Sequence, residues 1–255
     1  DREVTRDFFA RHSDLRAVIH FAALKAVGES VNKPLEYYFN NLNSLMNVLT
    51  CMREFKVPNL VFSSSCTVYG QADVLPVTEK TPRHEAESPY GNTKVMSEDI
   101  IRDLMRVEPD MKALALRYFN PIGAHPTAFI GELPNGVPNN LIPYLTQTAI
   151  GIREQLSVFG DDYNTPDGSP LRDYIDVVDL AQAHVVAIRR LLDGKNKKNY
   201  EFFNIGTGKA LSVLEIIHAF ERATGVKVNY KVVGRRAGDI EKVWADTTLA
   251  NNELG

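Results

Sequence analysis

Cysteine is scarce in this sequence, which holds only Cys51 and Cys66 among its 255 residues. The two cysteines form no C-x-x-C pair and show no spacing that is typical of metal ligands. This pattern excludes a disulfide framework, and no metal site is expected. Because both cysteines lie in apolar surroundings, we expect free, buried thiols in a reducing compartment, and therefore a cytoplasmic protein.

Long apolar runs, a signal peptide and a strong charge of one sign are missing as well. No segment approaches the roughly 18 consecutive apolar residues that a membrane span requires. The net charge at pH 7 is −3, which does not favour nucleic acid or an acidic membrane surface as a partner. We therefore expect neither a nucleic-acid partner nor a membrane partner.

The chain does contain enough apolar material for a substantial core, since 44% of its residues are hydrophobic. Short, continuous apolar runs at 15–23, 59–65 and 112–120 predict strands that are buried on both faces. Strands of this kind occur in parallel sheets with helices on either side. The expected fold class is therefore α/β, with a doubly wound parallel sheet.

Two helices are predicted between these strands. The second begins where Ser88 can cap a helix and Pro89 can occupy its first position. The first is indicated by apolar residues spaced 4, 3, 4 and 3, which are Tyr38, Leu42, Leu45, Leu49 and Met52.

The sequence changes character after residue 120, where glycine and proline follow one another closely. We expect a first domain over 1–120 and a smaller α/β substrate lobe over 121–255. The elements predicted in this second part are helices near 138–151, 179–193 and 212–224 and strands near 156–159, 200–205 and 228–233.

The segment SPYGNTK places Tyr90 and Lys94 four residues apart near the start of a predicted helix. Residues at this spacing are neighbours on one helix face. A nearby ammonium favours the phenolate and lowers the pKa of the phenol, so the pair can form a proton-abstracting base. A single match of this kind also arises by chance and carries little weight alone.

Small and polar residues follow each predicted strand, in HFAALK, SSSCTVYG and RYFNPIG. Ligands of open parallel sheets bind at the carboxyl ends of the strands. Ser65 could therefore place its hydroxyl in the same cleft as Tyr90, and Lys25 could lie beside a phosphate. The alternative is that these small residues only permit tight turns.

Eight segments together resemble the UDP-glucose 4-epimerases of the extended short-chain dehydrogenase/reductase family. The resemblance covers nearly the whole chain, but it starts about 60 residues into the family pattern, beyond the first strand and the Gly-rich turn that holds NAD. We therefore expect a fragment of a Rossmann-type domain that lacks its N-terminal strands. The segments are HFAALKAVGESVNKPLEYYFNN, VFSSSCTVYG, SPYGNTK, RYFNPIGAH, VPNNLIPY, GSPLRDYIDVVDLA, NIGTG and RRAGD.

The resemblance implies an isomerase of galactose metabolism that inverts carbon 4 of UDP-galactose and UDP-glucose through a 4-keto sugar. It implies NAD as the cofactor, a UDP-hexose as the substrate and a homodimer as the intact protein. The family assigns Tyr90 as the base, Ser65 as the residue that aligns the sugar hydroxyl, and Lys94 as the partner of the phenol and of the nicotinamide ribose.

The resemblance also carries over two sets of binding residues. Val243, in EKVWAD, matches the position beside the 2-substituent of the sugar, and its small size implies that N-acetylhexosamine forms are accepted too. The NAD contacts are Phe21, Ala22, Ala23, Leu24, Lys25, Asn40, Ser65, Tyr90, Lys94 and Phe119. The substrate contacts are Asn120, Asn140, Leu141, Ser157, Phe159, Arg172, Arg236, Asp239 and Val243.

Two alternatives remain open. One is another nucleotide-sugar enzyme of the same superfamily, a dehydratase or a decarboxylase. The related dehydratases carry an Asp-Glu pair where this chain has Cys66 and Thr67, so the acid for that reaction is absent. The other is a non-catalytic sensor of NAD or a sugar nucleotide, which would be expected to have lost Tyr90 or Lys94.

Overall fold

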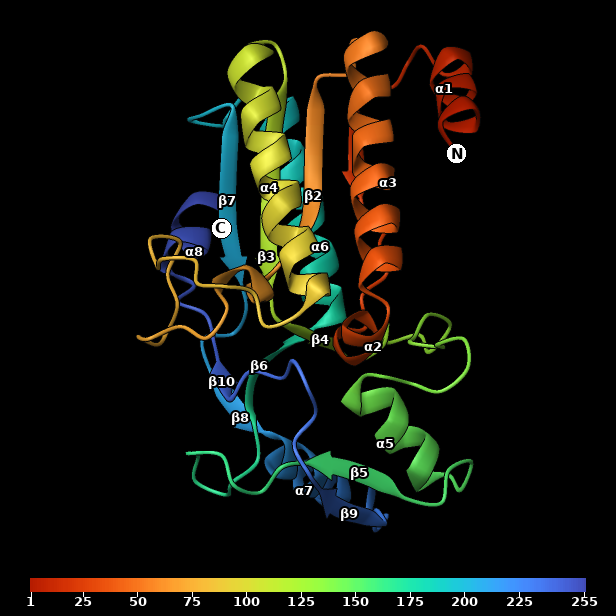
Figure 1. Cartoon of the computed structure of the whole chain (residues 1–255), viewed down its shortest axis with the longest axis vertical. Helices are drawn as coiled ribbons and strands as arrows, with labels where there is room; N and C mark the ends of the chain where they lie inside the picture. Colours follow the sequence, from red (N-terminus) through yellow and green to blue (C-terminus); the bar gives the residue numbers. More distant parts are fainter.

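Four parallel strands form the sheet of the larger lobe in this computed structural model, which describes residues 1–255 (Figure 1). Their order across the sheet is β1-β2-β3-β7. The predicted α/β fold with a parallel sheet is confirmed. The strands are β1 (Ala17–His20), β2 (Asn59–Ser65), β3 (Lys112–Tyr118) and β7 (Tyr200–Ile205).

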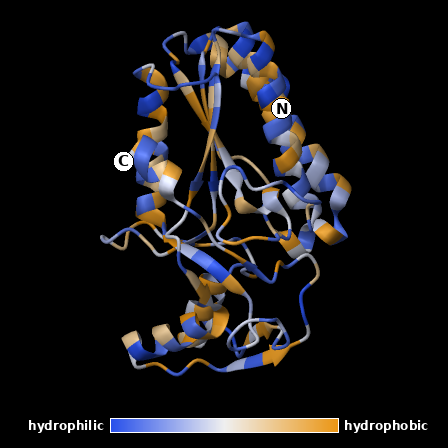
Figure 2. Ribbon diagram, turned by 90° about the vertical axis from the view of Figure 1, so that its left-hand side faces the viewer, coloured by the Kyte–Doolittle hydropathy of each residue, from blue (hydrophilic) through white to orange (hydrophobic).

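Helices cover both faces of this sheet, which Figure 2 shows nearly edge-on. Alternate strand residues serve the two faces: Leu60 and Phe62 of β2 pack with α3 and α4, and Val61 packs with α6. Burial on both faces explains why β2 is apolar or small from Leu60 to Ser65, and all of its residues are buried. The helices of this lobe are α1 (Arg2–Arg11), α2 (Val27–Asn32), α3 (Pro34–Glu54), α4 (Pro89–Val107), α6 (Val177–Leu192) and α8 (Thr248–Leu254), with a short 3₁₀ helix η1 at Cys66–Tyr69.

The buried face of α3 differs from the predicted stripe in its first two turns. Leu45, Leu49 and Met52 are buried as predicted, but Tyr38 and Leu42 are only half-buried. Their neighbours Tyr37 and Asn41 are buried instead. The Tyr37 hydroxyl donates to Glu29 and accepts from the Ala26 amide, so polar contacts with α2 and with the loop before it set the rotation of this end of the helix.

The smaller lobe packs α5 and α7 on a two-stranded parallel sheet of β5 and β9 (Figure 1). Its core contains Leu145, Leu156, Val158, Ile217 and Val228. Helix α7 begins with a capping box between Ser212 and Glu215. The elements are α5 (Leu141–Ala149), β5 (Leu156–Phe159), α7 (Val213–Thr224) and β9 (Tyr230–Val233).

Two elements expected in the smaller lobe lie in the larger one. Strand β7 pairs with β3, and α6 covers the larger sheet. Composition after residue 120 does not reveal which sheet a later strand joins, because the pairing partner is distant in sequence. A small sheet that was not predicted lies between the lobes, with strands β4 (Asn120–Ile122), β6 (Leu171–Asp176), β8 (Ala210–Ser212) and β10 (Lys242–Val243).

Cys51 and Cys66 are both free and buried, which confirms the prediction for the thiols. The cytoplasmic location expected from them stays a prediction. None of the helices combines the length and the apolar character that crossing a bilayer would require.

Candidate active site

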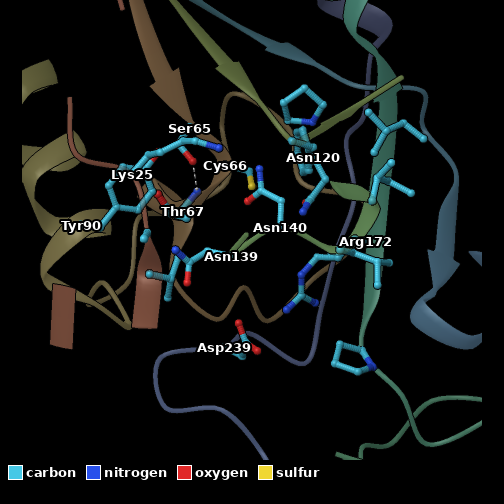
Figure 3. A pocket seen from close by; sticks show the side chains of 18 of the residues that line it. Lys25, Ser65, Cys66, Thr67, Tyr90, Asn120, Asn139, Asn140, Arg172 and Asp239 are labelled. Atoms are coloured by element: carbon cyan, nitrogen blue, oxygen red, sulfur yellow. Dashed lines mark hydrogen bonds between the residues drawn. The ribbon is translucent and has the colours of Figure 1, made fainter. Parts of the chain in front are cut away.

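A cavity of about 650 Å³ lies where the carboxyl ends of β1, β2 and β3 meet the smaller lobe. Both lobes and the small sheet between them contribute to its wall. Figure 3 shows Ser65, Thr67, Tyr90 and Lys25 on one side of it and Arg172 on the other. The predicted site residues that line it are Phe21, Ala23, Lys25, Ser65, Tyr90, Lys94, Phe119, Asn120, Asn140, Leu141, Ser157, Phe159, Arg172, Arg236, Asp239 and Val243.

Ala22, Leu24 and Asn40 are the predicted contacts that do not line this cavity. Asn40 is exposed on α3, and its side-chain NH₂ group donates to the side-chain amide oxygen of Asn41. Asn41 accepts from the Leu24 amide at 2.8 Å and donates to the Leu24 carbonyl at 3.0 Å, so it fixes the loop after β1. Sequence reasoning missed Asn41, although a polar residue within the apolar face of a helix was a usable signal.

The start of α4 positions Tyr90 and Lys94. Ser88 caps the helix by accepting from the Gly91 amide, and Pro89 takes the first helical position, as predicted. Tyr90 then faces the cavity, and Lys94 follows one turn later on the same side. The Lys94 ammonium donates to the Ser63 carbonyl at 2.7 Å and lies 5.9 Å from the centre of the Tyr90 ring.

Burial controls the ionisation of both groups. It raises the pKa of Tyr90 above its usual range, and the neighbouring Tyr118 phenol adds to this effect while the Ser65 hydroxyl opposes it. Burial also lowers the pKa of Lys94 to about 8, against the opposing effect of the Glu98 carboxylate. The predicted lowering of the Tyr90 pKa by Lys94 is therefore wrong. The reason is burial of the phenol, while the Lys94 ammonium is bonded to Ser63 and is not among the groups that shift the Tyr90 pKa.

Ser65 lies at the end of β2 with its hydroxyl directed toward the cavity. Its oxygen accepts from the Thr67 amide at 3.2 Å, the contact drawn in Figure 3. Because that bond uses the oxygen as an acceptor, the hydroxyl proton remains available to a neighbour in the cavity. The hydroxyl can thus serve as a donor beside the Tyr90 phenol.

A buried ion pair between α4 and β3 stabilises this end of the sheet. Glu98, one turn after Lys94 on α4, accepts two bonds from the Arg117 guanidinium at 2.8 and 2.5 Å. It also accepts from the Ser64 hydroxyl, and Arg117 donates onward to the Tyr69 hydroxyl. The pair ties α4, β2, β3 and η1 together, so it holds the elements that carry Ser65, Tyr90 and Lys94. Nothing in the sequence pattern indicated it.

The opposite wall carries two arginines on separate segments. Arg236 forms a bidentate pair with Asp239, at 3.0 and 2.8 Å. One terminal nitrogen of Arg172 donates to the carbonyls of Leu171 and Glu241, which leaves its remaining donors toward the cavity. Planar guanidinium groups suit the oxygens of phosphate and carboxylate ligands.

Between these walls lies an apolar corner formed by Val243, Cys66 and Phe119, which belong to one buried cluster. Strand β10 pairs with β6 so that Val243 stands opposite Arg172. Burial raises the pKa of Cys66 to about 12, so the thiol is neutral at physiological pH and serves as an apolar wall.

The chain matches known proteins along its whole length. The sequence model of the NAD dependent epimerase/dehydratase family matches residues 1–206. UDP-glucose 4-epimerase of Mus musculus is 51% identical over 255 residues, all of this chain and 72% of the mouse protein. UDP-glucose 4-epimerase of Erwinia amylovora is 50% identical over 254 residues, all of this chain and 74% of that protein.

Solved structures agree with the sequence matches. UDP-glucose 4-epimerase of Bifidobacterium longum, in complex with NAD+ and UDP, superposes with a TM-score of 0.95 at 46% identity, over all of this chain and 75% of that one. The UDP-Glc/GlcNAc 4-epimerase of Campylobacter jejuni superposes with a TM-score of 0.80 at 34% identity, with the same coverage. The resemblance seen in the sequence motifs is confirmed, and the chain belongs to the NAD dependent epimerase/dehydratase family.

Proposed function

We propose that the protein is an NAD-dependent epimerase that interconverts UDP-galactose and UDP-glucose by inversion at carbon 4. The observation that carries this proposal is the lining of the cavity between the lobes. Tyr90, Ser65 and Lys94 converge on one wall, and Arg172 and Arg236 stand on the other. The printed names of relatives about half identical to the chain point to the same activity.

The residues at the strand ends fit NAD. The Lys94 ammonium has three N–H donors, and one of them donates to the Ser63 carbonyl. Two buried donors therefore remain for the hydroxyls of a ribose. Phe21 leaves an exposed aromatic surface at the end of β1, and Lys25 reaches the cavity with a largely exposed ammonium. When bound, NAD takes up and returns the hydride of the reaction. Phe21, Lys25 and Lys94 are the residues that would hold it.

Tyr90 and Ser65 handle the proton of the sugar 4-hydroxyl. An alcohol carbon releases hydride readily only if the hydroxyl proton leaves too, so a base at this oxygen is required. Tyr90 takes and returns that proton, and Ser65 donates to the same oxygen and orients it. Because burial stabilises the neutral phenol, the base requires positive charge beside it, which bound NAD, through its nicotinamide ring, would supply together with the Lys94 ammonium 5.9 Å from the ring centre.

Arg172 and Arg236 bind the diphosphate of the substrate at the opposite wall. Arg172 already has donors free, whereas Arg236 must exchange part of its pairing with Asp239 for phosphate oxygens. Anchoring the nucleotide at a distance from Tyr90 leaves the hexose as the part that faces the base.

The direct test is conversion of UDP-galactose to UDP-glucose by the full protein with NAD, measured by chromatography of the nucleotide sugars. We expect reactions started from UDP-galactose and from UDP-glucose to reach the same equilibrium mixture of the two sugars. Recovery of unchanged UDP-galactose, with NAD bound, would remove the proposal. Release of water or carbon dioxide from the sugar would favour a dehydratase or a decarboxylase instead.

The cavity disfavours the dehydratase. The wall at positions 66 and 67 carries a neutral thiol and a hydroxyl, neither of which can act as the required acid. The carboxylates that line the cavity are Glu132 and Asp239, and both are already paired, with Lys25 and Arg236 respectively. A sensor without catalysis is disfavoured because Tyr90 and Lys94 are both in place.

We also propose that N-acetylhexosamine forms are accepted. Val243 lines the cavity as a small residue beside Arg172, and a bulkier side chain at this point would fill the space of an acetamido group. The Campylobacter jejuni protein described as a UDP-Glc/GlcNAc 4-epimerase supports this wider range within the family.

A homodimer is the proposed assembly, with α3 as the contact surface. Leu35 is 81% exposed and Phe39 74% exposed, and they lie on the same face of α3 as the partly exposed Met46. A second copy is the partner that buries such a face in both subunits at once. In sedimentation experiments we expect a dimer for the full protein and a monomer for Phe39→Asp. A monomeric parent protein would contradict the proposal.

A further inference from the structure

A long segment without helix or strand, residues 123–140, joins β4 to α5 at the mouth of the cavity. In Figure 1 it is the green loop that runs beside α2 before entering α5. Long structureless connections within compact domains usually have a function of their own. Part of this segment belongs to the cavity wall, including Glu132, Val137 and Asn140.

Apolar packing does not hold the outer part of this segment. Phe129 is 93% exposed and Leu133 91% exposed. Its backbone bonds close a local turn, from the His125 amide to the Ile130 carbonyl and from the Ala128 amide to the His125 carbonyl. These contacts shape the loop but do not fix it to the rest of the molecule.

Glu132 supplies the polar contacts that do so. One carboxylate oxygen accepts from the Asn140 side-chain amide at 2.7 Å and lies 3.7 Å from the Lys25 ammonium. No other side chain or backbone group of residues 124–138 makes a hydrogen bond or ion pair outside that stretch. One carboxylate therefore attaches the outer part of the loop, residues 124–138, over the cavity, while Arg236 holds the base of the loop by donating to the Asn139 carbonyl at 3.4 Å.

The same carboxylate determines how its two partners face the cavity. A carboxylate only accepts hydrogen bonds, so it holds the NH₂ group of Asn140 and leaves the amide oxygen of that residue for a ligand. The carboxylate also pairs with the ammonium of Lys25, in the loop after β1, at 3.7 Å. Glu132 thus connects the wall proposed to hold NAD with the wall proposed to hold the sugar nucleotide.

We propose that Glu132 is a positioning residue, which orients Asn140 and Lys25 and thereby closes the 123–140 segment over the bound nucleotide sugar. This inference rests on the proposed function for the identity of the ligand. Since the Glu132 side chain is 34% exposed and that of Lys25 is 64% exposed, the attachment is weak enough to open for ligand exchange.

The test compares three variants of the full protein loaded with NAD. Glu132→Ala removes both contacts, Glu132→Gln keeps an acceptor for Asn140 and removes the charge that attracts Lys25, and Asn135→Ala alters an exposed residue of the same loop as the control. UDP affinity is measured by calorimetry, the rate of loop cleavage by limited proteolysis, and kcat and KM with UDP-galactose.

For Glu132→Ala we expect UDP to bind about tenfold more weakly, which corresponds to about 1.4 kcal/mol, and the loop to be cleaved faster. KM should rise while kcat changes less than twofold, because Glu132 does not touch the reacting atoms. The UDP affinity, cleavage rate and KM of Glu132→Gln should lie between those of Glu132→Ala and the parent, and those of Asn135→Ala should match the parent.

Equal UDP affinity and equal cleavage rates in Glu132→Ala and the parent would overturn the proposal. A loss confined to kcat would also overturn it, because that result would place Glu132 in the chemical step. If the parent does not epimerise UDP-galactose, the proposed function fails, but UDP affinity and loop cleavage still decide the role of Glu132.

Discussion

The two sides of the cavity are built in opposite ways. On the side of Tyr90 and Lys94, the supporting residues are buried: Glu98 is 1% exposed and is bonded to Arg117 and Ser64. On the side of residues 123–140, a half-exposed carboxylate and one bond from Arg236 to the Asn139 carbonyl hold a loop that exposes Phe129 and Leu133 to water. Proton transfer requires fixed distances, whereas binding requires a route for entry, and each side has the rigidity that its task requires.

The largest effect is expected from Tyr90→Phe, which tests the rigid side directly. The ring and its packing remain, and only the group that exchanges the proton is lost. We expect kcat to fall by about 10³-fold, within the range for general acid–base catalysis, with UDP affinity unchanged. The measurement is a coupled assay with UDP-galactose. Tyr144→Phe, which removes another cavity phenol on α5, is the control and should retain nearly full activity. Activity of Tyr90→Phe near that of the parent would exclude Tyr90 as the base.

Breaking the buried ion pair of Glu98 should destabilise the protein more than removing the carboxylate of Glu132. Glu98→Ala leaves the Arg117 guanidinium buried without its partner, so we expect the free energy of unfolding to fall by about 3–5 kcal/mol. Glu132→Ala removes an exposed carboxylate and should cost at most about 1 kcal/mol. Urea denaturation of both variants measures the difference. Equal losses would show that the contrast in rigidity between the two sides does not exist.

Lys94→Met should slow the reaction and stabilise the protein at neutral pH. Burial lowers the pKa of Lys94 to about 8. Unfolding restores the usual pKa near 10.4. Between these values the unfolded chain binds more protons, so the free energy of unfolding of the parent rises as pH increases. Below pH 8 the folded parent bears the cost of a buried ammonium, about 3 kcal/mol, which the variant avoids.

The check on Lys94→Met is urea denaturation of parent and variant from pH 7 to pH 10, together with kcat at neutral pH. We expect the rise of stability above pH 8 to be weaker in the variant and kcat to be lower by about 100-fold. The same rise in both proteins would mean that the ammonium is not buried in solution.

The smallest effect is expected from Val243→Tyr, which changes the apolar corner between the two sides. The added ring should exclude the acetamido group, so kcat/KM for UDP-N-acetylgalactosamine should fall by at least about tenfold relative to UDP-galactose. Plain sugars should be affected much less. If parent and variant show the same ratio of kcat/KM for the two sugars, Val243 does not control the choice.

The sequence by itself determined the local elements of this protein. Continuous apolar runs marked three strands of the larger sheet because strands buried on both faces must be apolar throughout. Ser88 and Pro89 marked the start of α4 because capping depends on adjacent residues. The four-residue spacing then placed Tyr90 and Lys94 on one face of that helix, and the motifs identified the family.

Only the tertiary structure decided how distant segments meet. Strand β7 joined the larger sheet, and Glu98 paired with Arg117 of β3, because both depend on partners that are remote along the chain. The direction of the Tyr90 pKa shift was likewise decided by burial, which outweighed the neighbouring charge expected from spacing. Glu132 came to lie between Lys25 and Asn140 through the path of one loop across the cavity. Periodicity and capping act over a few residues, whereas burial and pairing depend on the whole fold.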